Sequence, residues 1–175
     1  MAIYYISDLH FNHKRIIELC NRPYETVEEM NEDIIRRWNS VVTEKDEVYF
    51  LGDAGMPRNV TSQKEIANLM KRLNGKIHLV EGNHDHKIVK DTYFRKIFES
   101  ISSYKRIKDN GRDVMLFHYP IEDWDGKYRG SYHIHGHIHN NKEAIKTVIP
   151  NRFNVSVEVI DYTPKTLDQL IEIYG

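Results

Sequence analysis

The sequence predicts an α/β protein in which two sheets pack together and helices cover their outer faces. Helical and strand patterns alternate up to Phe98, whereas strand patterns dominate from Ser102 onwards. Almost every motif that could carry chemistry follows directly after a predicted strand, which is the edge where open α/β sheets bind ligands. The chain has 175 residues and shows no linker or repeat, so we expect one domain spanning residues 1–175.

Apolar residues that recur at helical spacing predict the helices. Thr26 with Glu29, and Ser62 with Glu65, form the capping-box pattern that opens a helix. The helix that follows Ser62 is expected to end before the Asn74-Gly75 pair. The expected helices cover residues 13–20, 26–41, 62–73, 91–98 and 167–174.

Short apolar runs predict the strands. Asp109-Asn110-Gly111 lies between two such runs and predicts a hairpin turn. Residues 153–160 alternate between apolar and polar side chains, which indicates a half-buried strand. The expected strands cover residues 2–6, 47–51, 77–80, 104–106, 114–117, 132–135 and 153–160.

Composition excludes several classes of protein. The formal net charge is -1, from 25 basic and 26 acidic residues, which argues against a protein that coats nucleic acid. Cys20 is the only cysteine, so no intrachain disulfide and no thiolate metal cluster are expected. The longest apolar runs are of strand length and the first ten residues lack the pattern of a signal peptide. We therefore expect a cytoplasmic protein without a membrane segment.

Two pairs of polar residues share the same spacing, Asp8 with His10 and His137 with His139. In an extended chain, residues i and i+2 point to the same face, so both members of a pair can reach one metal ion. Asp8 alone is equally well explained as a turn residue or a helix cap, and His10 alone as a structural histidine.

Two acidic motifs lie between these pairs. Asp53 follows a predicted strand and is the natural candidate to bridge two ions, because a carboxylate can bridge where a neutral imidazole cannot. In Gly82-Asn83-His84-Asp85, Asn83 offers a neutral oxygen ligand and His84 a proton donor near neutral pH. Asp85 is expected to hold the His84 ring in one tautomer. An ordinary turn is the alternative explanation of this motif.

Histidines dominate the last motifs. His118 ends an apolar strand pattern. Residues 133–139 contain four histidines at strand spacing, interrupted by Gly136, and such a run of histidines has little structural use. Oxygen and imidazole ligands suit hard and borderline divalent ions. We expect two of them, with manganese as the first choice and iron, zinc, nickel or magnesium as alternatives.

The ordered set of these motifs resembles the calcineurin-like metallophosphoesterase superfamily, in particular its short, uncapped microbial and phage members. The resemblance implies a four-layer α/β/β/α sandwich of two mixed sheets, with His84 as the catalytic histidine. It implies two sets of metal ligands, which are Asp8, His10, Asp53 and His139 for one ion and Asp53, Asn83, His118 and His137 for the other. Two departures from the family pattern, at residues 11–13 and 54–57, put the substrate pocket in doubt but remove no ligand.

The expected activity is hydrolysis of a phosphate ester, with a diester favoured, by a hydroxide that bridges the two ions. The expected partner is a small phosphate ester or a nucleotide. A nuclease is the alternative, because Lys87, Lys90, Arg95 and Lys96 form a modest basic stretch near the site. A non-enzymatic scaffold is a weaker alternative, because the scaffold member of the superfamily departs at the catalytic histidine whereas His84 is intact here.

Several residues near the motifs are candidates for contact with the substrate. Arg58 could pair with a phosphate oxygen, and Tyr119 or Trp124 could stack on a base. A surface charge or a core aromatic explains each of them equally well. The full set of candidates is Asn12, His13, Arg22, Arg58, Tyr119 and Trp124.

Overall fold

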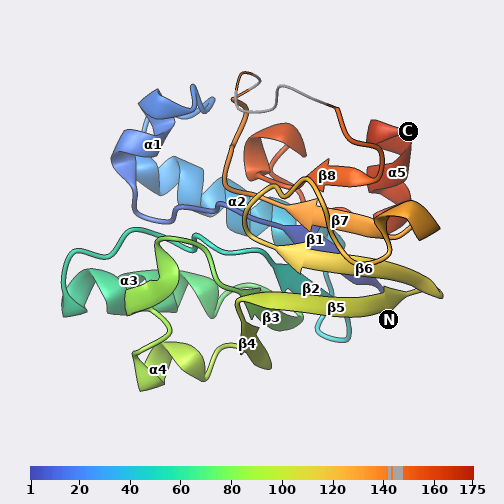
Figure 1. Cartoon of the computed structure of the whole chain (residues 1–175). Helices are drawn as coiled ribbons and strands as arrows, with labels where there is room; N and C mark the ends of the chain where they lie inside the picture. The colour runs from blue at the N-terminus through green and yellow to red at the C-terminus, as the bar shows by residue number, and fades with distance from the viewer. Residues whose placement is uncertain (142, 144–147) are drawn as a thin grey trace.

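The computed structural model describes residues 1–141, 143 and 148–175, and contains two four-stranded sheets (Figure 1). The strands of the first sheet, in spatial order, are β1 (Ile3–Ile6), β2 (Glu47–Phe50), β3 (Lys76–Val80) and β4 (Ser100–Ser102). Those of the second are β5 (Tyr104–Asp109), β6 (Arg112–Phe117), β7 (Tyr132–His135) and β8 (Arg152–Asn154). The second sheet is mixed, as expected, whereas the first is parallel throughout.

Two neighbouring tyrosines on β1 show how the layers are stacked. The Tyr4 hydroxyl donates a hydrogen bond to Val41 O at the end of a helix, at 2.9 Å, whereas the Tyr5 hydroxyl donates to Asp109 Oδ2 in the second sheet, also at 2.9 Å. Because successive side chains of a strand point to opposite faces, one face of the first sheet is covered by helices and the other by the second sheet. The expected arrangement of two packed sheets with helices is confirmed.

The α-helices are α1 (Lys14–Leu19), α2 (Val27–Val41), α3 (Val60–Met70), α4 (Thr92–Arg95) and α5 (Leu167–Tyr174). Thr26 caps α2 as predicted, accepting a hydrogen bond from Glu29 N. The expected start of α3 is wrong. Asn59, not Ser62, is its N-cap, and Ser62 instead occupies the third position of the capping box. None of the described helices is long and apolar enough to span a membrane.

The predicted strand over residues 153–160 is shorter than expected. β8 ends at Asn154, and Val157–Val159 form a 3-10 helix, η4. The outer face of the second sheet is covered by the segment after β6, where the buried Trp124 packs on His133 at 5.4 Å between ring centroids. This segment includes a second 3-10 helix, η2 (Lys127–Arg129).

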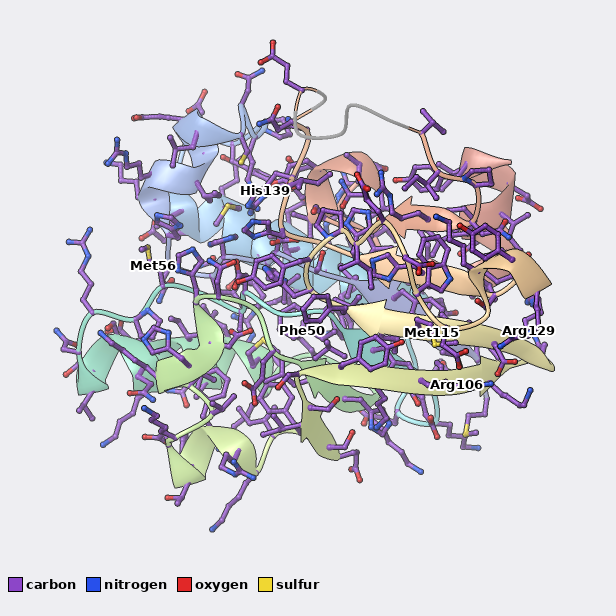
Figure 2. All side chains as sticks on the ribbon, in the orientation of Figure 1. Phe50, Met56, Arg106, Met115, Arg129 and His139 are labelled. Atoms are coloured by element: carbon purple, nitrogen blue, oxygen red, sulfur yellow. The ribbon has the colours of Figure 1, made fainter. Side chains whose placement is uncertain are left out.

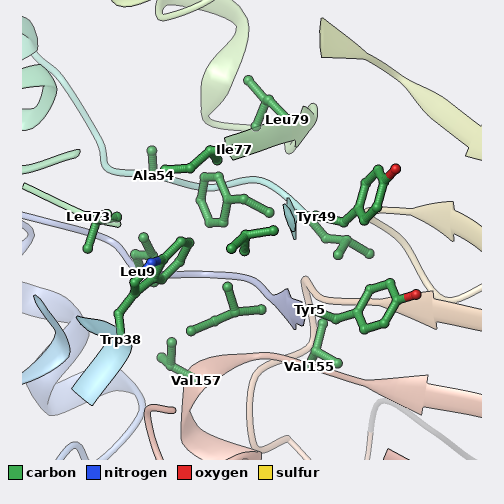
Figure 3. Packing of buried hydrophobic residues seen from close by; sticks show 14 of the residues in the cluster. Tyr5, Leu9, Trp38, Tyr49, Ala54, Leu73, Ile77, Leu79, Val155 and Val157 are labelled. Atoms are coloured by element: carbon green, nitrogen blue, oxygen red, sulfur yellow. The ribbon is translucent and has the colours of Figure 1, made fainter. Parts of the chain in front are cut away.

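The apolar core extends over both faces of the first sheet (Figure 3). Trp38 of α2 and Leu73 after α3 pack with Leu9 on the helical side. Tyr5 and Tyr49 stack at 6.1 Å on the side that faces the second sheet. Each of these side chains is at most 7% exposed, so the strand ends beside them are held rigidly.

The predicted site motifs lie together at the carboxyl ends of five strands, β1, β2, β3, β6 and β7. Backbone hydrogen bonds join the loops that follow these strands. Asp8 N donates to Gly52 O at 2.9 Å, His10 N to Asp53 O at 3.0 Å, and Gly136 N to His118 O at 2.9 Å. Both sheets therefore contribute to one polar edge, and residues up to 148 positions apart in the sequence meet there.

Candidate metal centre

Asp53 lies at the middle of the site and is 2% exposed. Its Oδ1 accepts a hydrogen bond from His84 N at 2.9 Å. Three imidazole nitrogens lie within 4.0 Å of its Oδ2: Nε2 of His118 at 3.5 Å, of His10 at 3.6 Å and of His84 at 4.0 Å. Burial raises the pKa of Asp53 above the usual carboxyl range. A buried carboxylate oxygen in this setting is well placed to face a cation.

Asp8 is fully buried and connects the two sheets. Its Oδ2 accepts hydrogen bonds from Ser7 Oγ at 2.6 Å, Ser156 Oγ at 2.8 Å and His137 N at 3.0 Å. Its Oδ1 lies 3.9 Å from His139 Nε2. A Cβ atom at position 136 would collide with Ser7 and Asp8, so only glycine allows the last motif to approach so closely.

Asn83, His118 and His137 converge on one point. Asn83 Oδ1 lies 3.0 Å from His118 Nε2 and 2.9 Å from His137 Nδ1. His118 Nδ1 lies 2.6 Å from the carbonyl oxygen of Leu51, so Nδ1 carries the proton and, in a neutral ring, Nε2 presents a lone pair. Two acceptors then face each other, and a metal ion between them would resolve the conflict. Asn83, His118 and His137 would together offer one oxygen and two nitrogen donors to such an ion.

His10 and His139 form the other half of the centre. His10 Nε2 is buried and has no hydrogen-bond partner among the described residues, while its Nδ1 lies 3.2 Å from His13 Nδ1. Burial alone would lower the pKa of His139, but hydrogen bonds to Cys20 and Glu158 raise it to about 10. The surroundings of His139 therefore favour a positive charge, which a divalent ion would supply. Asp8, His10 and His139 offer ligand atoms that all lie within 4.8 Å of one another, and so do Asp8, Asp53 and His118.

A buried ion pair between Arg22 and Glu158 contacts His139 on the side away from Asp8 Oδ1. His139 Nδ1 lies 3.0 Å from Glu158 Oε1, which also lies 2.7 Å from Arg22 Nη2. Arg22 donates to the carbonyl oxygens of Asp8 at 2.8 Å and Leu9 at 2.9 Å. The expectation that Arg22 contacts substrate is wrong, because the residue is 4% exposed and its guanidinium is used by these partners. Glu158 has no predicted role, since no spacing rule connects it to His139.

The expected role of Asp85 is corrected. Its carboxylate accepts hydrogen bonds from three backbone N–H groups, Asp53 N at 2.7 Å, Gly82 N at 2.8 Å and Ala54 N at 3.1 Å. In the described part of the chain no hydrogen bond joins it to the His84 ring. Asp85 therefore ties the loop after β2 to the loop after β3, and its effect on the centre passes through the position of Asp53.

The backbone at the expected ligands differs from the extended chain that the spacing suggests. Asp8, His10, Asp53, His137 and His139 all have φ between +49° and +72°, in the left-handed region. Both members of each i, i+2 pair still reach the centre, but they do so because the chain turns at each of them. Aspartate tolerates this conformation better than most residues, and so does histidine.

His84 lies at the open side of the centre. Its ring is half-buried and 5.5 Å from the His10 ring between centroids. Burial lowers the pKa of His84, and the charge of Asp85 acts in the opposite direction. A cavity of about 770 Å³ begins here, lined by His84, His10 and His139 on one side. The side chains of Met56 and His139 lie on the same side of the molecule (Figure 2).

The structure separates the remaining candidates for substrate contact. Arg58 is exposed and lines the cavity, and half-buried His13 lines it as well. Tyr119 is 36% exposed and packs on His137 at 4.5 Å between ring centroids. Asn12 is exposed but its amide pairs with Asn31, outside this cavity. The expectation for Trp124 is wrong, because its buried indole donates to Ser131 Oγ at 3.1 Å.

Carboxylates and imidazoles gathered at the carboxyl edge of a two-sheet α/β fold define a metallohydrolase. The sequence matches the calcineurin-like phosphoesterase superfamily domain over residues 1–151. The chain therefore belongs to this superfamily. It is a metal-dependent hydrolase of phosphoric esters, and the resemblance inferred from the motifs is confirmed.

Similar proteins occur in archaea, bacteria and phages. An uncharacterized protein of Methanocaldococcus jannaschii is 42% identical over 174 residues, covering 98% of this chain and 90% of that protein. The Gene 66 protein of Mycobacterium phage L5 is 32% identical over 179 residues, covering 89% of this chain and 86% of that protein. The crystal structure of a protein of unknown function from Aquifex aeolicus superimposes with a TM-score of 0.78 at 28% identity, covering 98% of both chains. A novel archaeal phosphodiesterase shares the fold, with a TM-score of 0.51 at 17% identity over 89% and 82% of the chains.

Proposed function

We propose that this protein is a dinuclear metal-dependent phosphodiesterase that acts on a small phosphate diester. The observation that carries the proposal is the convergence of His10 and His118, from two different ligand sets, on Asp53 Oδ2. A carboxylate oxygen approached from both sides suits a bridge between two ions. The cavity of about 770 Å³ beside this point leaves room for the second substituent of a diester.

Two groups of side chains would hold the ions. The proposed ligands of the first are Asp8, His10, Asp53 and His139, and those of the second are Asp53, Asn83, His118 and His137. When bound, divalent ions supply Lewis-acid chemistry, which polarises the ester and lowers the pKa of coordinated water. The donors are nitrogen and oxygen, so manganese is the first choice, with iron, zinc, nickel and magnesium as alternatives.

His84 is the proposed proton donor to the leaving oxygen. Its ring borders both Asp53 and the cavity, so it faces the place where the ester would lie. A lowered pKa makes the protonated ring a stronger acid, although it reduces the protonated fraction at neutral pH. Asp85 would act indirectly, by fixing the backbone around Asp53.

The test compares bis-p-nitrophenyl phosphate with p-nitrophenyl phosphate. Protein stripped with a chelator is reconstituted with one metal at a time, and bound metal is measured alongside the rate. We expect two equivalents of metal, no turnover without metal, and faster hydrolysis of the diester. Faster hydrolysis of the monoester would overturn the diester preference, and no turnover with both sites filled would overturn the enzymatic proposal. Short oligonucleotides, with and without free ends, test the nuclease alternative.

A further inference from the structure

The cavity beside the metal centre is lined by three segments that are remote in sequence. One wall comes from α1 and carries Arg15, Ile16 and Leu19. A second comes from the loop after β2, with Met56 to Arg58, and a third from the 3-10 helix η1 (Asp85–Lys87), with Lys87. The cavity volume of about 770 Å³ far exceeds what a single phosphate fills and falls in the range of sites for drug-sized ligands.

The charge of this lining is one-sided. Arg15, Arg58 and Lys87 are exposed cations, and the cavity lining contains no carboxylate. Within the described residues, none of the three side chains takes part in a salt bridge. Glu18, Glu28 and Glu65 line the adjoining hollow, to which Arg15 and Arg58 also belong, but not this cavity. Unneutralised cations that share a cavity attract an anion, and arginine is suited to binding phosphate oxygens through two parallel hydrogen bonds.

The same cavity exposes apolar surface. Leu19 is 62% exposed and Met56 is 48% exposed, although both are large hydrophobic residues. Ile16 and Pro57 complete the apolar part of the lining. Methionine adapts its shape readily, so this surface can accept an organic group without demanding one particular outline. The ligand must therefore combine an apolar part with an anionic part.

We infer that the cavity binds one substituent of the phosphodiester and that this substituent carries a second phosphate of its own. This inference rests on the proposed function and adds the class of substrate. The reacting phosphate lies at the metal centre, and the second phosphate lies among Arg15, Arg58 and Lys87. Hydrolysis adds water across one P–O bond of the diester, giving a phosphomonoester and either an alcohol that takes up the proton or a nitrophenolate with the proton released to solvent. The second phosphate is not cleaved and serves for recognition.

A matched pair of substrates tests the inference. Thymidine 5′-(p-nitrophenyl phosphate) is compared with the same compound carrying a 3′-phosphate, and p-nitrophenyl hexyl phosphate with its 6-phosphohexyl analogue. In each pair we expect the second phosphate to raise kcat/KM by at least about tenfold, mainly through KM, because charge-assisted hydrogen bonds contribute that much. A gain in the nucleoside pair alone would identify a nucleotide, and a gain in both pairs any phosphorylated organic group. Equal kcat/KM values within both pairs would overturn the inference while leaving the proposed function intact.

Variants locate the second phosphate. In Arg58→Gln and Lys87→Gln, the ratio of kcat/KM between the members of a pair should fall toward one. Arg129→Gln is the matched control, because Arg129 is an exposed arginine at the far side of the molecule (Figure 2), where it pairs with Asp125. The control should keep the ratio of the wild type. A wild-type ratio in both cavity variants would overturn the assignment to this cavity.

A binding measurement makes the test independent of turnover. Thymidine 3′,5′-bisphosphate and thymidine 5′-phosphate are titrated calorimetrically into the protein in the presence of a chelator. We expect the bisphosphate to bind at least about tenfold more tightly, with a difference that shrinks as salt is added. Equal affinities would overturn the inference even if the protein proved inactive on every ester.

Discussion

The two ends of strand β2 carry aspartates in opposite circumstances. Asp46, just before the strand, accepts hydrogen bonds from Ala2 N at 2.7 Å, Thr43 Oγ1 at 2.7 Å and Thr43 N at 2.9 Å. These hydrogen bonds, that from Ala2 above all, lower the pKa of Asp46 to about 2. Asp53, just after the strand, is also buried, yet its Oδ2 accepts no hydrogen bond from the described residues and lies near three histidine nitrogens, and burial raises its pKa.

The difference distinguishes a structural carboxylate, Asp46, from the proposed metal ligand Asp53, seven residues later in the chain. Where both oxygens of a carboxylate accept hydrogen bonds, as in Asp46, the protein itself stabilises the charge. Where an oxygen is left without a hydrogen-bond donor, the folded protein carries an electrostatic cost that a bound cation can offset. Substitutions at these two carboxylates, and at His84 and Glu158, test this contrast.

The largest effect is expected for Asp53→Asn. Removing the shared carboxylate should weaken both metal sites and reduce turnover by more than about 100-fold, because metals supply several kcal/mol of transition-state stabilisation. In the presence of a chelator, the melting temperature should be no lower than that of the wild type, since the buried charge is gone. Metal analysis and thermal melts check both points. Two full equivalents of metal in this variant would exclude the bridging role.

His84→Ala should leave the metal content unchanged and reduce turnover by about 10²- to 10⁴-fold, as expected for loss of a general acid. The loss should be larger for a nucleoside leaving group than for p-nitrophenol, which departs without a proton. Rates with both leaving groups, measured on protein of known metal content, decide the matter. A similar loss with both leaving groups would contradict a role in proton donation.

Glu158 combines the situations of Asp46 and Asp53. Its Oε1 forms ion pairs with His139 and Arg22, whereas its Oε2 is buried without a hydrogen-bond partner among the described residues. Glu158→Gln should reduce metal affinity by about 10- to 100-fold, the usual effect of losing a carboxylate that orients a metal-binding histidine. Activity should return at high metal concentration. Glu32→Gln breaks an exposed ion pair with Arg72 and is the matched control. Unchanged metal titration curves for Glu158→Gln would show that the ion pairs of Glu158 contribute to stability alone.

The smallest effect on activity is expected for Asp46→Asn, which should turn over like the wild type. Its free energy of unfolding at pH 7 should fall by about 1–3 kcal/mol, because hydrogen bonds to a charged acceptor are lost. The pKa of Asp46 is lowered by folding, so its stabilisation is present above about pH 4 and disappears as the pH falls toward 2. Urea unfolding of both proteins at pH 7, 4 and 2.5 checks this. A difference that stays constant over the range would contradict the prediction.

Sequence reasoning succeeded where a motif follows a strand, since Asp8, Asp53, Asn83 and His118 meet because parallel strands end at one edge. It failed at the level of the backbone, because the spacing of Asp8 and His10 does not reveal that each adopts a left-handed conformation. It also placed the cap of α3 three residues late, because Ser62 fits two overlapping patterns, as a cap before Glu65 and as the residue three positions after the cap Asn59.

The sequence suggested Arg58 and Lys87 one by one, but it predicted neither Glu158 nor the way in which the residues beside the centre are grouped. Glu158 reaches His139 from 19 positions away and through a 3-10 helix, a placement that no local pattern encodes. The cavity wall combines Arg15, Arg58 and Lys87 from three separate segments, and only the tertiary fold brings them together. Arg22 and Trp124, which were expected to be candidates for substrate contact, are instead buried in the interior.

The left-handed backbone at the proposed ligands has a consequence for protein engineering. Each of these five residues holds a conformation that costs of the order of 1 kcal/mol for a non-glycine residue. Glycine would relieve the strain at each position but would delete the ligand, so the usual route to a more thermostable variant is closed here. Stability and catalysis thus compete directly at this edge, and gains in melting temperature must be sought at helix caps and surface positions remote from it.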